Sequence, residues 1–372
     1  MGVSILKKKF LFVLPAAKLS GGAQRVMFNL ARHLVLNNQD VTLITMTRGF
    51  EKGWDVLNDY SNFNWIIGEY KSEKSSLIPI TLQILELDRK HHFDYVVSSH
   101  IHVNSFLSTL KRLGAFSKAY LISRESSMVF ENKNEYKRYF YILIYKFIYG
   151  NQDLLICQTD SMKKSLLDNL GFKPVDTVNV IPNPVDIKFI KSKLANDNSK
   201  PLNQRYIVAC GRFVKIKQFD LLIDAFANVH ASNPEFKLII LGDGPEKANL
   251  LAKVKNLNLE SRILFPGNVD NPFLYFYHAE VGVISSKTEG FPNVLLEMMA
   301  SGIKRIVTTP CTEALKNIPN LIITENSSKH SITNGIQKAI DENLDYSEEY
   351  KLIVTKNHSI ENFWESIEQS II

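Results

Sequence analysis

Two glutamates that enclose a helix start form the segment best suited to chemistry in this chain of 372 residues. Glu289 and Glu297 flank Gly290-Phe291-Pro292-Asn293, whose proline and asparagine predict the beginning of a helix. Carboxylates accept hydrogen bonds from sugar and ribose hydroxyls, and a helix N-terminus attracts phosphate. Acidic residues near a helix start are also common where nothing binds, so this segment needs support from elsewhere in the chain.

Positive charge follows a predicted strand in the same half of the chain. Arg212 and Lys217 come after the apolar run 206–210 and before a helix predicted over 218–230. An arginine can hold two oxygens at once, whereas a lysine acts as a point charge. At the carboxyl end of a strand such a pair is suited to a diphosphate, and the alternative is a solvated basic loop.

A glycine pair, Gly21-Gly22, follows the first predicted strand, 10–14. Paired glycines let the backbone pass close to a ligand, and the helix behind them presents N–H groups and a positive dipole end. The full dinucleotide-binding pattern Gly-x-Gly-x-x-Gly is absent at this turn. The pair therefore indicates either a ligand contact or a tight strand-to-helix turn.

Polar side chains also follow two later strands of the first half. His100 and His102 come after the strand predicted over 95–98, and Arg124 comes after the strand predicted over 120–123. Strand ends of this kind line ligand crevices in parallel sheets. The alternative for both histidines is an ordinary polar loop.

The elements that would position these side chains alternate regularly. Short apolar runs alternate with amphipathic helical stretches along the whole chain, which predicts an α/β fold with parallel sheets covered on both faces. The alternation breaks at 181–186, a segment with two prolines, and at the polar stretch 196–204. We expect one domain over 1–185, a second over 203–355, and a last helix, 356–372, that could pack back on the first domain.

Composition and charge narrow the class of protein. The net charge of +6 suits an anionic substrate or membrane surface, but no basic tract carries a nucleic-acid-binding motif. Three widely spaced cysteines favour neither a disulfide framework nor a zinc site, and favour a reducing cytosol. No run reaches the roughly 20 apolar residues of a spanning helix. We therefore expect a cytoplasmic protein, with a peripheral position on the cytoplasmic membrane as one variant.

These motifs, in this order, resemble retaining glycosyltransferase family 4, whose members have the GT-B fold. The resemblance implies two Rossmann-like domains that face each other across a cleft. It spans nearly the whole chain, and the glutamate pair is its most specific part. The matching pieces are Gly21-Gly22-Ala23-Gln24, 181–186, Gly211-Arg212, Lys217, Gly242-Asp243-Gly244-Pro245, Phe265-Pro266-Gly267 and 289–297.

The resemblance also implies roles for individual residues toward a nucleotide-sugar donor. Arg212 and Lys217 would neutralise the diphosphate, and Glu297 would bind the ribose. Glu289, with the backbone at Gly290 and Phe291, would bind the transferred sugar. The remaining implied contacts are Val269 beside the base, Gly21-Gly22 over the phosphates or the acceptor, and His100 and Arg124 near acceptor or sugar. Many relatives have histidine where this chain has Arg124, which puts that donor contact in doubt.

The implied reaction is transfer of a hexose or N-acetylhexosamine, with UDP favoured over GDP as carrier, to a glycan acceptor. The family analogy suggests a polyprenyl-diphosphate-linked acceptor, as in the assembly of O-antigen, capsule or other surface polysaccharides. No cofactor or metal is expected, because cations already face the leaving group and no Asp-x-Asp motif is present. The alternatives are a nucleotide-sugar epimerase, a phosphorylase, or a non-catalytic nucleotide-sugar-binding subunit.

The segment 133–149 mixes cations with aromatic rings. Its residues include Tyr136, Lys137, Arg138, Tyr139, Phe140, Tyr145, Lys146, Phe147 and Tyr149. Such a mixture suits a helix that lies in an anionic membrane interface. It equally suits an amphipathic helix whose rings pack in the core of the first domain.

Overall fold

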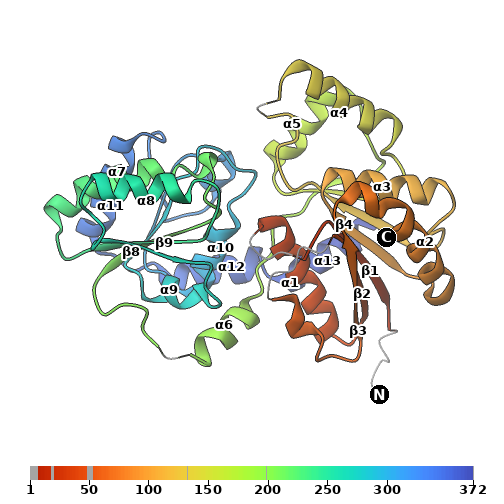
Figure 1. Ribbon diagram of the computed structural model, residues 1–372, viewed down its shortest axis with the longest axis horizontal. Coiled ribbons are helices and arrows are strands. Elements are labelled where there is room, and N and C mark those ends of the chain that lie inside the picture. Colours follow the sequence, from red (N-terminus) through yellow and green to blue (C-terminus); the bar gives the residue numbers. More distant parts are fainter. Residues whose placement is uncertain (1–6, 18–20, 48–52, 132, 198, 372) are drawn as a thin grey trace. The chain divides into compact units, whose positions relative to one another are not determined.

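The computed structural model describes residues 7–17, 21–47, 53–131, 133–197 and 199–371, which form two compact units (Figure 1). The first unit contains Met1–Asn183 and Ile360–Ile372, and the second contains Pro184–Ser359. Each unit is a parallel β-sheet with helices on both faces, so the predicted pair of Rossmann-like α/β halves is confirmed.

The first unit has seven parallel strands in the order β3-β2-β1-β4-β5-β6-β7. The strands are β1 (Lys9–Leu14), β2 (Asp40–Thr47), β3 (Phe63–Tyr70), β4 (Tyr95–Ser99), β5 (Tyr120–Arg124), β6 (Leu154–Cys157) and β7 (Val178–Val180). The helices are α1 (Gly22–Leu36), α2 (Glu73–His91), α3 (Ile101–Arg112), α4 (Glu135–Phe147), α5 (Asp160–Leu170) and α13 (Ile360–Ile371). The strand order reverses between β1 and β4, the place where such sheets bind ligands at their carboxyl ends.

The second unit has six parallel strands in the order β10-β9-β8-β11-β12-β13. They are β8 (Tyr206–Cys210), β9 (Lys237–Leu241), β10 (Ile263–Gly267), β11 (Val281–Ile284), β12 (Ile306–Thr308) and β13 (Ile322–Ile323). The helices are α6 (Ile187–Ala195), α7 (Phe219–Ser232), α8 (Lys247–Asn256), α9 (Pro272–His278), α10 (Asn293–Ser301), α11 (Lys329–Glu342) and α12 (Ser347–Asn357). Here the order reverses between β8 and β11, which brings the loops behind these strands together.

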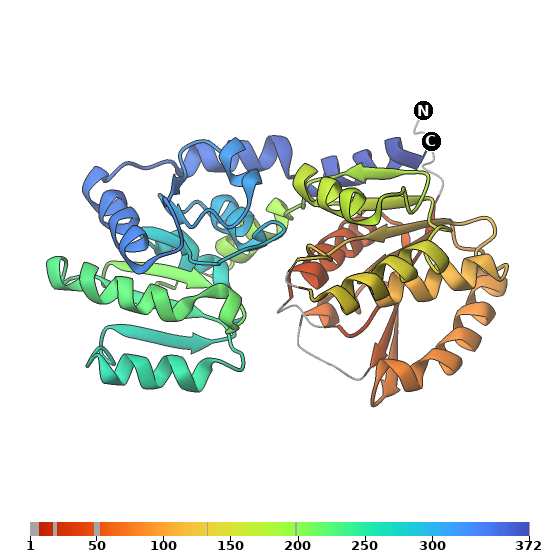
Figure 2. The same cartoon turned by 90° about the horizontal axis from the view of Figure 1, so that it is seen from above.

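The chain passes between the units at two places, Asn183/Pro184 and Ser359/Ile360. The boundary expected between residues 185 and 203 differs from the structure, where the second unit begins at Pro184 and includes α6, whose Ile190 is buried and which packs on α9 and α10. At the other end α13 belongs to the first unit. Its Trp364 packs edge-on against Phe10 of β1, with ring centroids 5.2 Å apart, and both views place α13 beside this sheet (Figures 1 and 2).

Two glycines allow the loop after β9 to pack directly on the loop after β8. A Cβ at Gly242 would lie 2.1 Å from the carbonyl oxygen of Gly211, and one at Gly244 would lie 2.5 Å from that of Phe213. Gly242 also has a φ of +126°, which L side chains rarely adopt. These contacts fix the backbone that leads from β8 to Lys217.

None of the helices in the described part of the chain combines the length and the apolar character needed to cross a bilayer.

We predict that Gly242→Ala destabilises the second unit strongly. Positive φ and the clash with the Gly211 carbonyl together should cost about 3 kcal/mol. For a unit of this size the melting temperature should fall by roughly 6–12 °C in differential scanning calorimetry. Gly267→Ala is the matched control, since its φ is +82° but nothing lies within 4 Å of the added Cβ. It should cost only about 1 kcal/mol, and equal losses for the two variants would contradict the clash.

Candidate active site

An ion pair joins the two predicted charge-bearing segments of the second unit. The Lys217 ammonium lies 2.7 Å from Oε1 of Glu289, and both side chains are mostly buried, with 21% and 15% exposed. Lys217 follows β8 and Glu289 follows β11, so the reversal of strand order brings together residues 72 positions apart. The backbone N–H of Lys287 donates to the carbonyl of Ile216 at 2.8 Å, which ties the two loops together.

The helix start predicted between the glutamates is present. Pro292 is the N-cap of α10, and no acidic residue lies in its first turn to offset the positive dipole end. Glu289 precedes this helix in the loop, while Glu297 lies half-buried in its second turn. Gly290 and Phe291 lie in the same loop, where the Gly290 carbonyl accepts from Thr312 at 3.3 Å.

Arg212 and Val269, which were predicted to contact the nucleotide-sugar donor, also lie in the second unit, but neither belongs to this ion pair. The Arg212 side chain is exposed, and within the described part of the chain no hydrogen bond or ion pair holds its guanidinium. It is therefore available to an anion. Val269 follows β10 and packs, half-buried, against the hydrophobic core. Among the described residues, no hydrogen bond or ion pair joins Arg212 or Val269 to Lys217 or Glu289.

In the first unit the glycine pair begins α1. Gly21 is the N-cap of this helix in an extended conformation, and Gly22 is its first residue. A Cβ on Gly21 would meet only the movable amide of Gln24. The preceding Ser20 lies outside the described residues. The turn is thus the start of α1, beside the strand reversal. A larger side chain would fit at Gly21 if the side chain of Gln24 moved, so steric crowding does not require glycine there.

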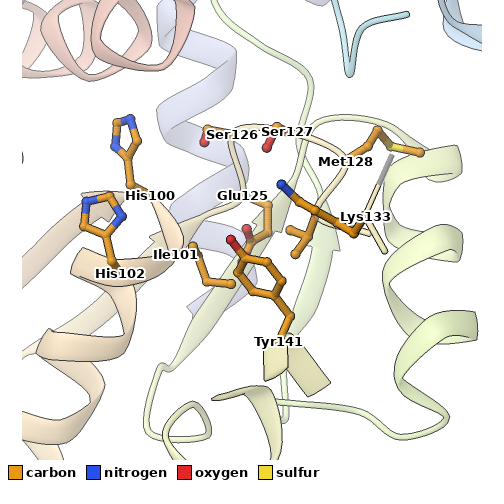
Figure 3. Close-up of a pocket in the computed structure, with 10 residues that line it drawn as sticks. His100, Ile101, His102, Glu125, Ser126, Ser127, Met128, Lys133 and Tyr141 are labelled. Atoms are coloured by element: carbon orange, nitrogen blue, oxygen red, sulfur yellow. The ribbon is translucent and has the colours of Figure 1, made fainter. Parts of the chain in front are cut away.

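A pocket of about 170 Å³ lies at the carboxyl ends of β4 and β5 in the first unit (Figure 3). Its lining includes His100, His102, Glu125, Ser126, Ser127, Met128, Lys133 and Tyr141. Figure 3 shows the two histidines on one side of it and Lys133 with Met128 on the other. The pocket therefore combines hydroxyl, imidazole, carboxylate and ammonium groups, as a polar ligand requires.

His100 occupies this pocket in a strained conformation. Its φ is +140°, which is rare for any residue except glycine, and its buried Nδ1 has no hydrogen-bond partner. Burial, with the nearby His102 and Arg124, lowers the pKa of His100 to about 4. The imidazole is therefore neutral near pH 7 and can accept or donate a hydrogen bond. His102 instead pairs with Glu73 at 2.8 Å.

Arg124 ends β5 but does not line the pocket. It is 1% exposed, and its guanidinium donates to Ser99 and Asn183. Burial lowers the pKa of Arg124 to about 10, so the side chain still carries its charge at neutral pH. The side chain thus braces the strand ends of the first unit instead of pointing into the pocket with His100.

The sequence analysis missed Glu125, which follows Arg124 and is buried while lining the pocket. Its Oε1 accepts hydrogen bonds from the hydroxyls of Tyr145 at 2.8 Å and Tyr149 at 3.1 Å. Burial raises the pKa of Glu125, while these two hydrogen bonds and the charge of Arg124 act in the opposite direction. Its place directly after a predicted strand was the one signal in the sequence.

The segment 133–149 contains both buried and exposed aromatic rings, and its contact with a membrane stays a prediction. Tyr145 and Tyr149 are buried and hold Glu125, as a core-facing helix would. Four other rings of α4 are largely exposed: Tyr136, Tyr139, Phe140 and Phe147 at 88%, 65%, 61% and 60%. Lys137, Arg138 and Lys146 of the same helix are exposed as well. We call these four rings and three cations the outer face of α4.

The two Rossmann-like α/β units have the architecture of the GT-B glycosyltransferases, and comparison with known proteins agrees. Residues 190–357 match the family model described as glycosyl transferases group 1, and residues 20–189 match that of glycosyltransferase family 4. Together the two matches span both units. The chain belongs to glycosyltransferase family 4 and is a glycosyltransferase. This result favours transfer over the epimerase, the phosphorylase and the non-catalytic subunit considered from the sequence.

Individual relatives and structures are similar to this chain over different lengths. An uncharacterized glycosyltransferase of Methanocaldococcus jannaschii is 28% identical in an alignment of 296 residues, with a coverage of 70% for each of the two chains. The N-acetylgalactosamine-N,N'-diacetylbacillosaminyl-diphospho-undecaprenol 4-alpha-N-acetylgalactosaminyltransferase of Campylobacter jejuni is 33% identical over 46% of this chain and 47% of its own. The crystal structure of Anabaena HepE with UDP-glucose has a TM-score of 0.78 at 16% identity, over 98% of this chain and 99% of that one, a likeness of fold.

We predict that Glu125→Gln changes how stability depends on pH. A carboxyl whose pKa is raised in the folded state contributes most stability below its unfolded pKa, about 4.3, and loses that contribution as pH rises through the folded pKa. Glutamine accepts the same tyrosine hydroxyls but does not ionise. The unfolding free energy of the variant should therefore rise relative to the wild type between pH 4.5 and 7. Urea denaturation followed by tryptophan fluorescence tests this, because Trp54, Trp65 and Trp364 all lie in the first unit. Parallel pH curves for the two proteins would contradict it.

Proposed function

We propose that this glycosyltransferase moves a hexose or N-acetylhexosamine from a UDP-linked donor to a lipid-linked glycan, with retention of the anomeric configuration. The observation that carries the proposal is the Lys217–Glu289 pair, 2.7 Å apart, at the strand reversal of the second unit and beside the start of α10. This arrangement offers a cation for a phosphate and a carboxylate for sugar hydroxyls within one small region.

In the proposed reaction the bond between the anomeric carbon and the diphosphate breaks, and its electron pair leaves with the nucleotide. Lys217, Arg212 and the N-terminus of α10 would stabilise this growing negative charge, which is where fixed electrostatics help catalysis most. Glu289 would hold hydroxyls of the transferred sugar, Glu297 the ribose, and Val269 the base. Because these groups already supply positive charge, we propose that no metal ion takes part. Glu289 has no assigned role as nucleophile.

The acceptor is proposed to bind the pocket of the first unit. The pocket offers three kinds of group that recognise saccharide hydroxyls: the neutral imidazole of His100, the hydroxyls of Ser126 and Ser127, and the carboxylate of Glu125. The name of the Campylobacter relative specifies a sugar chain on diphospho-undecaprenol. By analogy we propose an acceptor of the same chemical class, a polyprenyl-diphosphate-linked saccharide that serves a surface polysaccharide.

Such an acceptor lies in a membrane, and the outer face of α4 is suited to reach it. Exposed aromatic rings enter the headgroup region of a bilayer, while lysines and arginines are attracted to anionic lipids. We propose that this face rests on the inner surface of the cytoplasmic membrane. The support is the exposure of the four rings and three cations of the outer face.

We predict that Lys217→Met weakens nucleotide binding at least tenfold and abolishes turnover. The variant removes the ammonium that would face the diphosphate, and a hydrogen bond to a charged group commonly carries this much binding energy. The wild type is first screened by thermal shift with UDP, GDP, UDP-glucose, UDP-galactose, UDP-N-acetylglucosamine and GDP-mannose, and calorimetry then gives the dissociation constants. Glu289→Ala should also abolish turnover while it leaves UDP bound.

Lys215→Met is the matched control, because Lys215 is an exposed lysine of the same loop. Its effect on nucleotide affinity should be within threefold. Equal losses for Lys215→Met and Lys217→Met would indicate general attraction by a basic loop and would contradict the assigned site. If no nucleotide in the screen binds the wild type, the proposed function itself is wrong.

We predict that the wild type floats with vesicles of phosphatidylglycerol and phosphatidylcholine at low salt and is released at high salt. The double variant Tyr139→Ser/Phe140→Ser, on the outer face of α4, should remain in the soluble fraction. Ile78→Ser/Leu82→Ser is the control, since these side chains of α2 are 77% and 64% exposed but lie outside the cation-rich helix. A wild type that stays soluble at low salt would rule out the membrane role.

A further inference from the structure

Two serines follow β11 and each holds one member of the ion pair. Ser285 and Ser286 are 1% and 2% exposed. The Ser285 hydroxyl donates to the backbone carbonyl of Lys217 at 2.7 Å. The Ser286 hydroxyl donates to Oε1 of Glu289 at 2.5 Å. The end of one strand thus fixes both the loop that carries the lysine and the carboxylate itself.

Ser286 is itself held rigidly. Its carbonyl accepts a hydrogen bond from the hydroxyl of Thr309, which follows β12, the next strand of the sheet. The backbone N–H of Glu289 donates to the carbonyl of Cys311 at 2.9 Å, so the loop is tied to the same neighbouring segment at both ends. A short side chain on so constrained a backbone has little freedom to move.

Both donors to Glu289 use the same oxygen. The Lys217 ammonium and the Ser286 hydroxyl both contact Oε1, whereas no hydrogen bond from the described residues reaches Oε2. The carboxylate is therefore held along one edge, and its second oxygen keeps its capacity to accept. In the proposed function, that second oxygen would bind a hydroxyl of the transferred sugar.

The two donors differ in how they would respond to a nucleotide diphosphate. Lys217 has a long flexible stem and three N–H donors, so a diphosphate competes with Glu289 for its ammonium. Ser286 carries no charge and is buried, so a diphosphate does not compete with Glu289 for its hydroxyl. When the lysine turns toward phosphate, the serine is the remaining group that fixes the orientation of Glu289.

We propose that Ser286 is a positioning residue that aims the free oxygen of Glu289 at the transferred sugar, so that it governs recognition of the sugar and not of the nucleotide. This inference rests on the proposed function of the second unit. Its consequence is a separation of affinities: Lys217 acts on the diphosphate, while Ser286 acts through Glu289 on the hexose alone.

The test compares nucleotide with nucleotide sugar in Ser286→Ala. Dissociation constants are measured by calorimetry for UDP and for the tightest binder among UDP-glucose, UDP-galactose and UDP-N-acetylglucosamine, or for GDP and GDP-mannose if GDP binds better. Loss of the Ser286 hydroxyl should weaken nucleotide-sugar binding about tenfold and change nucleotide binding less than twofold. Ser286→Thr keeps the hydroxyl and should restore sugar affinity to within threefold of the wild type.

Ser331→Ala is the control for the loss of a buried serine hydroxyl. Ser331 lies in α11 of the same unit, is 7% exposed and bonds to Asn326, with no part in the site. It should leave the ratio of the two affinities unchanged. Melting temperatures of all variants show whether each one is folded.

The outcomes separate the two levels of the argument. If the wild type binds neither nucleotides nor nucleotide sugars, the proposed function fails and this inference falls with it. If the wild type binds both and Ser286→Ala keeps the same affinity ratio, the site stands and the role of Ser286 is overturned. Equal weakening of both ligands together with a lowered melting temperature also overturns it, because that pattern indicates a purely structural serine.

Discussion

The attraction between Lys217 and Glu289 depends on a topological fact: β8 and β11 are neighbours in the sheet, although strands β9 and β10 and helices α7, α8 and α9 lie between them along the chain. Each charge emerges from its own strand end, and the pair is largely shielded from water, so the attraction is stronger than at an exposed surface. Removing both groups from water is costly, and such pairs contribute little to net stability. The arrangement is therefore better explained by what the charges can bind than by what they add to folding.

The neighbouring loops hold the backbone of the Lys217 loop in a fixed conformation. Gly242 and Gly244 bring the loop after β9 into backbone contact with Gly211 and Phe213, directly before the segment that carries Lys217. Phe213 is fully buried and anchors the same loop in the core. Glycine in these positions costs conformational entropy when the chain folds. The gain is a rigid path from β8 to the ammonium, and any binding site built on this loop inherits that rigidity.

The sequence predicted the two-unit α/β fold and singled out Lys217 and Glu289 as candidate site residues, because both follow apolar runs of strand length. It did not predict their direct contact, since strand order depends on tertiary packing and not on local pattern. Glu125 was not predicted for a related reason: a glutamate is expected at the surface, and the hydroxyls of Tyr145 and Tyr149 that satisfy it when buried lie 20 and 24 positions away in the chain. Arg124 was singled out, but its buried partner Asn183 lies 59 positions away.

The division of α4 into a buried and an exposed face follows from its contact with the buried carboxylate of Glu125. Tyr145 in the last turn of α4 and Tyr149, two residues beyond its end, both direct their hydroxyls to the buried Glu125, which fixes the orientation of the C-terminal part of the helix. With that orientation fixed, Tyr139 and Phe140 point to solvent, where large rings are unfavourable. A helix free to rotate would bury them. Their exposure beside several cations is thus imposed by the pocket, and it leaves a surface whose chemistry matches an anionic interface more closely than it matches water.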